Sequence, residues 1–253
     1  MPLLSLEHVT QRFGGLVAVG DLNFALDAGS IVAMIGPNGA GKSTVFNLIT
    51  GIYRPSAGRI VFDGVSLLGR STGAIAALGI ARTFQNVRLF SFMSVLDNVL
   101  AGEHARLRAH LVDDLLHTPR QRREERVAAE RAFELLRFVG LEREAQTTAR
   151  NLPYGLQRRL EIARALASQP KLVLLDEPAA GLNHSEKHDL IGLIRRIRER
   201  GATVFLIEHD MGLVMELSER ITVLDHGERI AEGTPAEVRA NPRVIEAYLG
   251  APA

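Results

Sequence analysis

The chain has 253 residues, of which 46% are hydrophobic, 23% charged and 5% aromatic, a composition typical of a globular protein rather than a disordered or fibrous one. Its 30 basic and 29 acidic residues leave a formal net charge of +1, which provides no broad electrostatic surface for nucleic acid, so we expect no nucleic-acid partner. The absence of cysteine excludes a disulfide framework, a thiolate nucleophile and cysteine-ligated zinc fingers.

The sequence shows neither a membrane span nor a secretory signal. Its longest stretch without Asp, Glu, Lys or Arg runs from Ala28 to Gly41 and contains glycine and proline, whereas a spanning helix needs about 20 mainly apolar residues. The first fifteen residues lack a basic segment followed by a long apolar one. The cytoplasm is therefore the expected location.

Short apolar runs predict β-strands, and longer segments with helical spacing separate them. The runs cover residues 31–35, 60–62, 172–175, 203–207 and 221–224. Strands that alternate with helices predict a mainly parallel sheet. In the segment 190–197, leucine and isoleucine recur at helical spacing between charged residues, which is typical of an amphipathic helix that covers a sheet.

The sequence GPNGAGKST at residues 36–44 follows the first of these runs and precedes a helical segment, as the phosphate-binding motif G-x-x-x-x-G-K-[ST] requires. Glycine allows backbone N–H groups to wrap a phosphate closely. Lys42 would supply charge for the β- and γ-phosphates, and the Ser43 hydroxyl would ligate Mg²⁺. The predicted nucleotide-binding residues of this loop are Gly36, Pro37, Asn38, Gly39, Ala40, Gly41, Lys42, Ser43 and Thr44.

Between about residues 84 and 166 the strand signals disappear and helical patterns replace them, including one over 127–139. We expect a helical subdomain inserted into the α/β core. Within it, residues 104–126 are polar and carry six arginines against four acidic residues. This pattern predicts a solvated helix pair with ion pairs, and an arm that faces a membrane or a partner is the alternative.

The segment KLVLLDE at residues 171–177 predicts an apolar strand that ends in two carboxylates. In a parallel sheet these would lie at the carboxyl edge, beside the phosphate loop. Asp176 could hold Mg²⁺ through water, and Glu177 could accept a proton from water that attacks the γ-phosphate. A pair that merely caps the following turn is the alternative. A small GTPase would need an Asn-Lys-x-Asp guanine reader, which the sequence lacks.

Together these motifs resemble the ATPase subunits of ATP-binding cassette (ABC) transporters over essentially the whole chain. The resemblance implies one nucleotide-binding domain at residues 1–253. Its α/β fold would combine a P-loop NTPase core and mainly parallel sheet, an N-terminal antiparallel β portion and the helical subdomain at about 84–166. ATP and Mg²⁺ would be its ligands. Lys42, Glu177 and His209 would be catalytic, with His209 as the switch histidine that contacts the γ-phosphate and the attacking water.

The resemblance also implies further contacts. Phe13 would stack on adenine, and Gln85 would touch Mg²⁺ and sense the membrane subunits. Residues 180–183, AGLN, correspond to the family's D-loop. The implied metal contacts are thus Ser43, Gln85 and Asp176.

Residues 151–166 resemble the signature helix of the family, with one departure. The usual Leu-Ser-Gly-Gly-Gln is replaced by LPYGL at residues 152–156, so Pro153 stands where a serine hydroxyl would bind the γ-phosphate. Tyr154 and Gly155 remain as nucleotide-contacting candidates. Since two cassettes of this family face each other head to tail, a weakened signature affects the partner's site. We therefore expect a heterodimer with a second ABC ATPase subunit, with a homodimer as the alternative.

The segments LEHVTQRFGGLVAV, RTFQNVRLFSFMSVLDNVL, DEPAAGLN, LIEHDMGLVM and GTPAEVRANPRVIEAYLG resemble the longer of the two paired ATPases of branched-chain amino acid importers. This implies two integral membrane permease subunits, an indirect periplasmic or extracellular substrate-binding protein, and a peripheral position on the cytoplasmic side of the cell membrane. Cassettes for urea or amide uptake or for lipopolysaccharide export, and a regulatory cassette that switches partners without pumping, are the alternatives.

Overall fold

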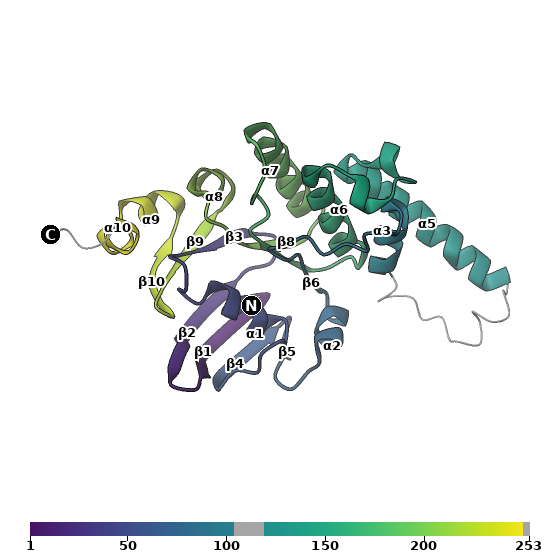
Figure 1. Cartoon of the computed structure of the whole chain (residues 1–253). Coiled ribbons are helices and arrows are strands. Elements are labelled where there is room, and N and C mark those ends of the chain that lie inside the picture. The colour runs from purple at the N-terminus through teal and green to yellow at the C-terminus, as the bar shows by residue number, and fades with distance from the viewer. Residues whose placement is uncertain (104–118, 250–253) are drawn as a thin grey trace. The chain divides into compact units, whose positions relative to one another are not determined.

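The protein is represented by a computed structural model that describes residues 1–103 and 119–249 (Figure 1). Most of the predicted helix pair at 104–126 lies outside the described residues. The chain forms two compact units, one built from Met1–Arg82 together with Lys171–Ala253 and the other from Thr83–Pro170. No described helix is both long and apolar enough to cross a membrane.

The first unit begins with a four-stranded antiparallel sheet in the order β2-β1-β4-β5. Its strands are β1 (Leu4–Phe13), β2 (Leu16–Leu26), β4 (Ala57–Phe62) and β5 (Val65–Ser66). The strand predicted at 60–62 lies here rather than in the parallel sheet. Asp63 and Gly64 both have positive φ and form a two-residue turn, so that Phe62 pairs with Val65 in the antiparallel strand that follows. A parallel neighbour would have needed a long crossover instead.

The second sheet of this unit has six strands in the order β10-β9-β3-β8-β7-β6. They are β3 (Ile31–Ile35), β6 (Ile80–Arg82), β7 (Leu172–Asp176), β8 (Thr203–Ile207), β9 (Arg220–Asp225) and β10 (Glu228–Gly233). All pairs are parallel except β10 with β9. Every residue of β3, β7 and β8 is buried, as strands covered on both faces require.

Helices and aromatic side chains complete the core of this unit. The helices are α1 (Lys42–Ile49), α2 (Thr72–Ala77), α7 (His184–Glu199), α8 (Met211–Leu217), α9 (Pro235–Ala240) and α10 (Pro242–Leu249). The predicted amphipathic helix is confirmed, because the apolar face of α7 is buried. Phe205 of β8 stacks on Phe24 of β2, with ring centroids 4.9 Å apart, and packs edge-to-face with Phe46 of α1, with centroids 5.1 Å apart. One apolar core therefore joins both sheets.

The second unit is helical, with α3 (Val95–Glu103), α5 (Pro119–Val139), α6 (Tyr154–Ala167) and the short 3₁₀ turns η2 (Glu142–Glu144) and η3 (Ala149–Asn151). Helices α3, α5 and α6 pack on one another. At the α3–α6 contact, a Cβ on Gly102 would lie 2.3 Å from the carbonyl oxygen of Arg164. The predicted class is therefore confirmed: an antiparallel N-terminal sheet, a mostly parallel sheet and a helical part.

Candidate functional site

The phosphate-binding sequence forms the connection between β3 and α1, as predicted. Gly36 and Gly41 have φ values of 151° and 100°. A Cβ on Gly36 would lie 2.0 Å from the carbonyl oxygen of Leu224, and one on Gly41 would lie 2.4 Å from that of Ala18. Both positions therefore need glycine for the backbone path and for close packing. The loop ends where α1 begins, so the N-terminus of α1 supplies N–H groups and positive potential for an anion.

Lys42 is the first residue of α1 and only 6% exposed. Its ammonium donates hydrogen bonds to the carbonyl oxygens of Gly36 at 2.7 Å and Pro37 at 2.8 Å. The positive charge therefore lies at the first two residues of the phosphate loop. Burial lowers the pKa of Lys42, while the negative charges of Glu177 and Asp176 raise it in part. The ammonium and the two carboxylates thus belong to one electrostatic cluster, as the predicted roles require.

Asp176 ends β7 and lies 4% exposed at the carboxyl edge of the sheet. Arg82 of the neighbouring strand β6 donates to its Oδ2 at 2.8 Å and also donates to Asn47 of α1 at 2.7 Å. The side chain of Ser43, in the first turn of α1, is exposed. A hydroxyl and a carboxylate are the hard oxygen donors that Mg²⁺ prefers, and an ion that keeps several waters would suit so small a donor set. These residues therefore fit the predicted ion.

Glu177 and His209 follow the adjacent parallel strands β7 and β8, and their side chains meet. His209 Nε2 lies 2.8 Å from Glu177 Oε1. Glu177 has a φ of 47°, a left-handed conformation that costs of the order of 1–3 kcal/mol in a residue other than glycine and is concentrated at functional sites. Its N–H is bonded to the carbonyl oxygen of Ile207 at 2.9 Å. A backbone held in this way aims the carboxylate at its histidine partner.

Glu208 is a neighbour of this pair that the sequence did not indicate. The side chain is 3% exposed, and its oxygens accept hydrogen bonds from the N–H groups of Ala179, His209 and Asp210. Burial raises the pKa of Glu208. In the sequence, Glu208 is only a charged residue that follows a predicted buried strand, and no motif indicates which groups its side chain binds.

The predicted adenine contact, Phe13, is the last residue of β1. The residue is 43% exposed, and its ring packs edge-to-face with that of Tyr53, with centroids 5.1 Å apart and planes at 74°. A partly exposed aromatic ring is suited to stacking on a planar group. The adenine role stays a prediction.

In the helical unit, two buried charges fasten the segment around Gln85 to α6. Arg158 donates to the carbonyl oxygens of Phe84, at 2.7 Å, and Gln85. Glu161 accepts from the N–H groups of Phe84 at 3.2 Å and Arg88 at 3.3 Å, and it pairs with Arg158 at 3.3 Å. Both residues are 2% exposed, and burial raises the pKa of Glu161. The sequence did not single out either residue, because a charged residue in a helix usually faces solvent.

The signature segment forms the start of α6. Pro153 is the residue before the helix, and its carbonyl oxygen accepts from the N–H groups of Leu156 and Gln157 at 3.0 Å each. No side chain caps this helix end, since proline has no hydroxyl to do so. Tyr154 is 43% exposed and lies under the guanidinium of Arg158, whereas Gly155 is buried. The nucleotide contacts expected of Tyr154, Gly155 and the exposed Gln85 stay predictions.

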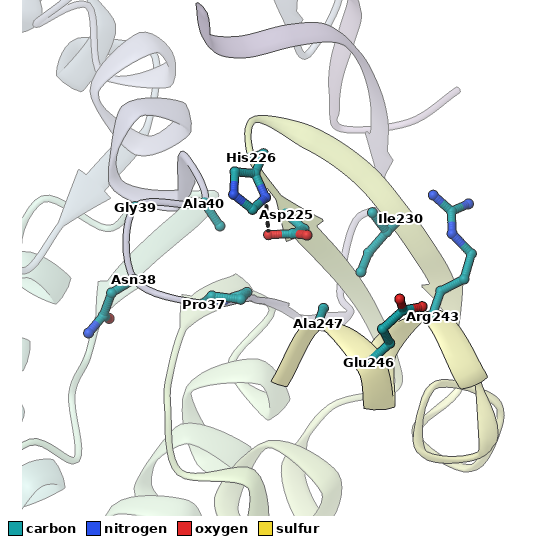
Figure 2. Close-up of a pocket in the computed structure, with 10 residues that line it drawn as sticks. All are labelled: Pro37, Asn38, Gly39, Ala40, Asp225, His226, Ile230, Arg243, Glu246 and Ala247. Carbon is teal, nitrogen blue, oxygen red and sulfur yellow. Dashed lines mark ion pairs between the residues drawn. The ribbon is translucent and has the colours of Figure 1, made fainter. Parts of the chain in front are cut away.

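A cavity of about 700 Å³ lies beside the phosphate loop (Figure 2). The loop, the β9–β10 turn and α10 form its walls, and its lining residues are Pro37, Asn38, Gly39, Ala40, Asp225, His226, Ile230, Arg243, Glu246 and Ala247. Gly227 of the turn donates to the carbonyl oxygen of Ala40 at 3.1 Å. The lining includes none of the three predicted catalytic residues, so this cavity is a neighbour of the phosphate loop rather than the predicted catalytic centre.

Comparison with known proteins agrees with these features. Residues 19–180 match the family model described as ABC transporter, and residues 228–253 match one described as branched-chain amino acid ATP-binding cassette transporter. The chain is 49% identical over 250 residues to BraF of Pseudomonas aeruginosa and to LivG of Escherichia coli K12, both high-affinity branched-chain amino acid transport ATP-binding proteins, with 98% of each chain covered.

Two solved structures are similar along most of the chain. The ADP conformation of an ATP-binding cassette of an ABC transporter has a TM-score of 0.85 at 30% identity and covers 99% of this chain and 100% of its own. A dimeric post-hydrolysis state of another cassette, bound to ADP and phosphate, has a TM-score of 0.77 at 27% identity and covers 92% of this chain and 98% of its own.

Proposed function

Because this chain belongs to the ATP-binding proteins of ABC transporters, we propose that it hydrolyses ATP to power an importer of the branched-chain amino acids leucine, isoleucine and valine. The substrate follows from the 49% identity to BraF and LivG and from the tail at residues 228–253. No residue of this cassette is expected to touch the transported amino acid. The substrate therefore rests on likeness, whereas the reaction also rests on the geometry of the site.

The Glu177–His209 pair is the observation that carries the reaction. We infer that the backbone N–H groups of residues 36–44, which all but Pro37 carry, hold the phosphates and that Lys42 neutralises them. Glu177 would accept the proton of a water molecule in line with the γ-phosphate, and His209, 2.8 Å away, would hold that carboxylate and the phosphate in place. Mg²⁺, near Ser43 and Asp176, would supply charge for the phosphate oxygens.

For partners, we propose a second ABC ATPase subunit and two membrane permease subunits, with this chain on the cytoplasmic face of the membrane. A related cassette is dimeric in its solved structure. Pro153, at the start of α6, has no hydroxyl to offer to a partner's γ-phosphate, so this chain would provide a poorer signature than one with serine at this position. The proposal is a heterodimer in which the partner's signature completes the site that contains Lys42.

Uptake of labelled leucine tests the transport function. Cells that lack this gene would be complemented with the wild-type chain or with Glu177→Gln. Rescue by the wild type alone is the expected result. A deletion strain with normal leucine, isoleucine and valine uptake would contradict the substrate and direct attention to urea or amide uptake or to lipopolysaccharide export.

Purified protein tests the residue roles. Glu177→Gln should bind ATP with nearly unchanged affinity and fail to turn it over, because an amide cannot act as the base. Lys42→Ala should lose ATP binding itself. Glu237→Gln is the matched control, since this carboxylate accepts a backbone N–H at the start of α9 instead. Normal turnover by Glu177→Gln would refute the base assignment.

A further inference from the structure

Glu208 belongs to the loop that carries His209, and its side chain reaches the loop that carries Glu177. It follows β8, and its neighbour in space, Ala179, follows β7. One carboxylate oxygen accepts from the Ala179 N–H at 2.7 Å, and the other accepts from the N–H groups of His209 at 3.0 Å and Asp210 at 3.3 Å. A single side chain therefore connects the loop after β7, which carries Glu177, with the loop after β8, which carries His209.

We propose that Glu208 is a positioning residue for ATP hydrolysis, which sets the spacing between the loop of Glu177 and the loop of His209. This inference rests on the proposed function of that pair. Another tie between the loops, besides the contact of the Glu177 and His209 side chains, is the bond from the Glu177 N–H to the carbonyl oxygen of Ile207. That bond holds the backbone at Glu177 itself. Glu208 holds the backbone two residues later, at Ala179, and the backbone at His209.

The chemistry of this position calls for a carboxylate. Three N–H donors converge on Glu208, and a carboxylate is acceptor-only, with an oxygen for each side of the gap. Burial raises the pKa of this group, the three backbone N–H groups lower it, and the nearby charge of Glu177 raises it again. Glutamine has the same shape but one acceptor oxygen, so its NH₂ group would face an N–H of either Ala179 or His209. One of the two attachments would then be lost.

The test is ATP hydrolysis and ATP binding by full-length Glu208→Gln, in the assembled transporter, with rates divided by the number of sites that bind ATP. We expect kcat to fall about ten-fold or more, because a misplacement of about 1 Å can cost roughly a hundred-fold, while the Kd for ATP stays within about two-fold. Glu237→Gln, a carboxylate that also accepts a backbone N–H, should leave both quantities unchanged.

A double-mutant cycle separates positioning from a general loss of folding. If Glu208 acts through His209, Glu208→Gln should lower kcat by less than about two-fold in a His209→Ala background. An equal loss in both backgrounds would overturn the inference, as would a rate per ATP-binding site equal to that of the wild type. If the wild-type chain itself hydrolyses no ATP, the proposed function fails instead, so the two failures are distinguishable.

Discussion

Replacement of Arg158 by methionine should destabilise the helical unit strongly. Arg158 is 2% exposed, and its guanidinium donates hydrogen bonds to the carbonyl oxygens of Phe84 and Gln85 and to the carboxylate of Glu161. Loss of one partner of a buried ion pair costs about 3–5 kcal/mol, because the other charge stays buried without it. Glu161 keeps the N–H groups of Phe84 and Arg88, so we take the lower end, about 3 kcal/mol.

Urea and thermal unfolding of the full-length chain measure this effect. For a chain of this size, 1 kcal/mol shifts the Tm by about 2–4 °C, so Arg158→Met should lower it by about 6–12 °C. The double variant Arg158→Met/Glu161→Leu removes both charges and should recover part of the loss. Arg126→Met is the matched control, since Arg126 is 73% exposed in its pair with Glu130 and should contribute less than about 1 kcal/mol.

Two results would refute this reasoning. A loss below about 1 kcal/mol in Arg158→Met would mean that the buried pair contributes no more than a surface pair does. A double variant no more stable than the single one would mean that the unpaired carboxylate of Glu161 is not the source of the cost.

The remaining predictions concern the first unit. Gly36→Ala should cost about 3 kcal/mol of unfolding free energy in urea, because its Cβ would clash with the Leu224 carbonyl oxygen. Gly39→Ala, with φ of 82° but no atom within 4 Å of the new Cβ, should cost about 1 kcal/mol. Equal losses in the two variants would contradict the packing argument. Gly192→Ala, in the interior of α7 with open space around it, should stabilise the protein by about 0.5–1 kcal/mol in the same assay, and a loss would show an unrecognised contact. The Lys187 ammonium lies 2.7 Å from the Asp210 carboxylate and lowers the pKa of Asp210 below its ordinary value of 3.8. The ion pair therefore stabilises the fold above pH 3.8, and this stabilisation is lost as the pH falls through the lowered pKa. Asp210→Asn should therefore show a flatter decline of unfolding free energy than the wild type below about pH 5, and parallel declines would contradict the assignment.

Motifs whose chemistry is local could be predicted from the sequence. The phosphate loop needs glycine, lysine and serine at set spacing between a strand and a helix, and the structure has β3 and α1 at its two ends. The apolar runs at 172–175 and 203–207 predicted buried strands, and both are confirmed within β7 and β8. The fold class and membership of the ATP-binding proteins of ABC transporters were predicted from the same motifs and are confirmed by the comparisons, which also find the predicted likeness to branched-chain amino acid transport cassettes.

Partners distant in the sequence could not be predicted in this way. The strand at 60–62 has the same apolar character as the parallel strands, and only the reversal at Asp63–Gly64 assigns it to the antiparallel sheet. Glu161 and Glu208 are single acidic residues in the sequence, but Glu161 binds backbone more than seventy residues away and Glu208 joins the two loops of the predicted catalytic pair.

The amino-acid order therefore predicted the chemistry of the candidate site: a phosphate-binding loop, a carboxylate and a histidine at strand ends, and a signature segment with proline in place of serine. Folding specified which buried charges hold those groups in place. The reason is that a motif depends on neighbours along the chain, whereas the partners of a buried carboxylate come from whichever strands and helices pack beside it.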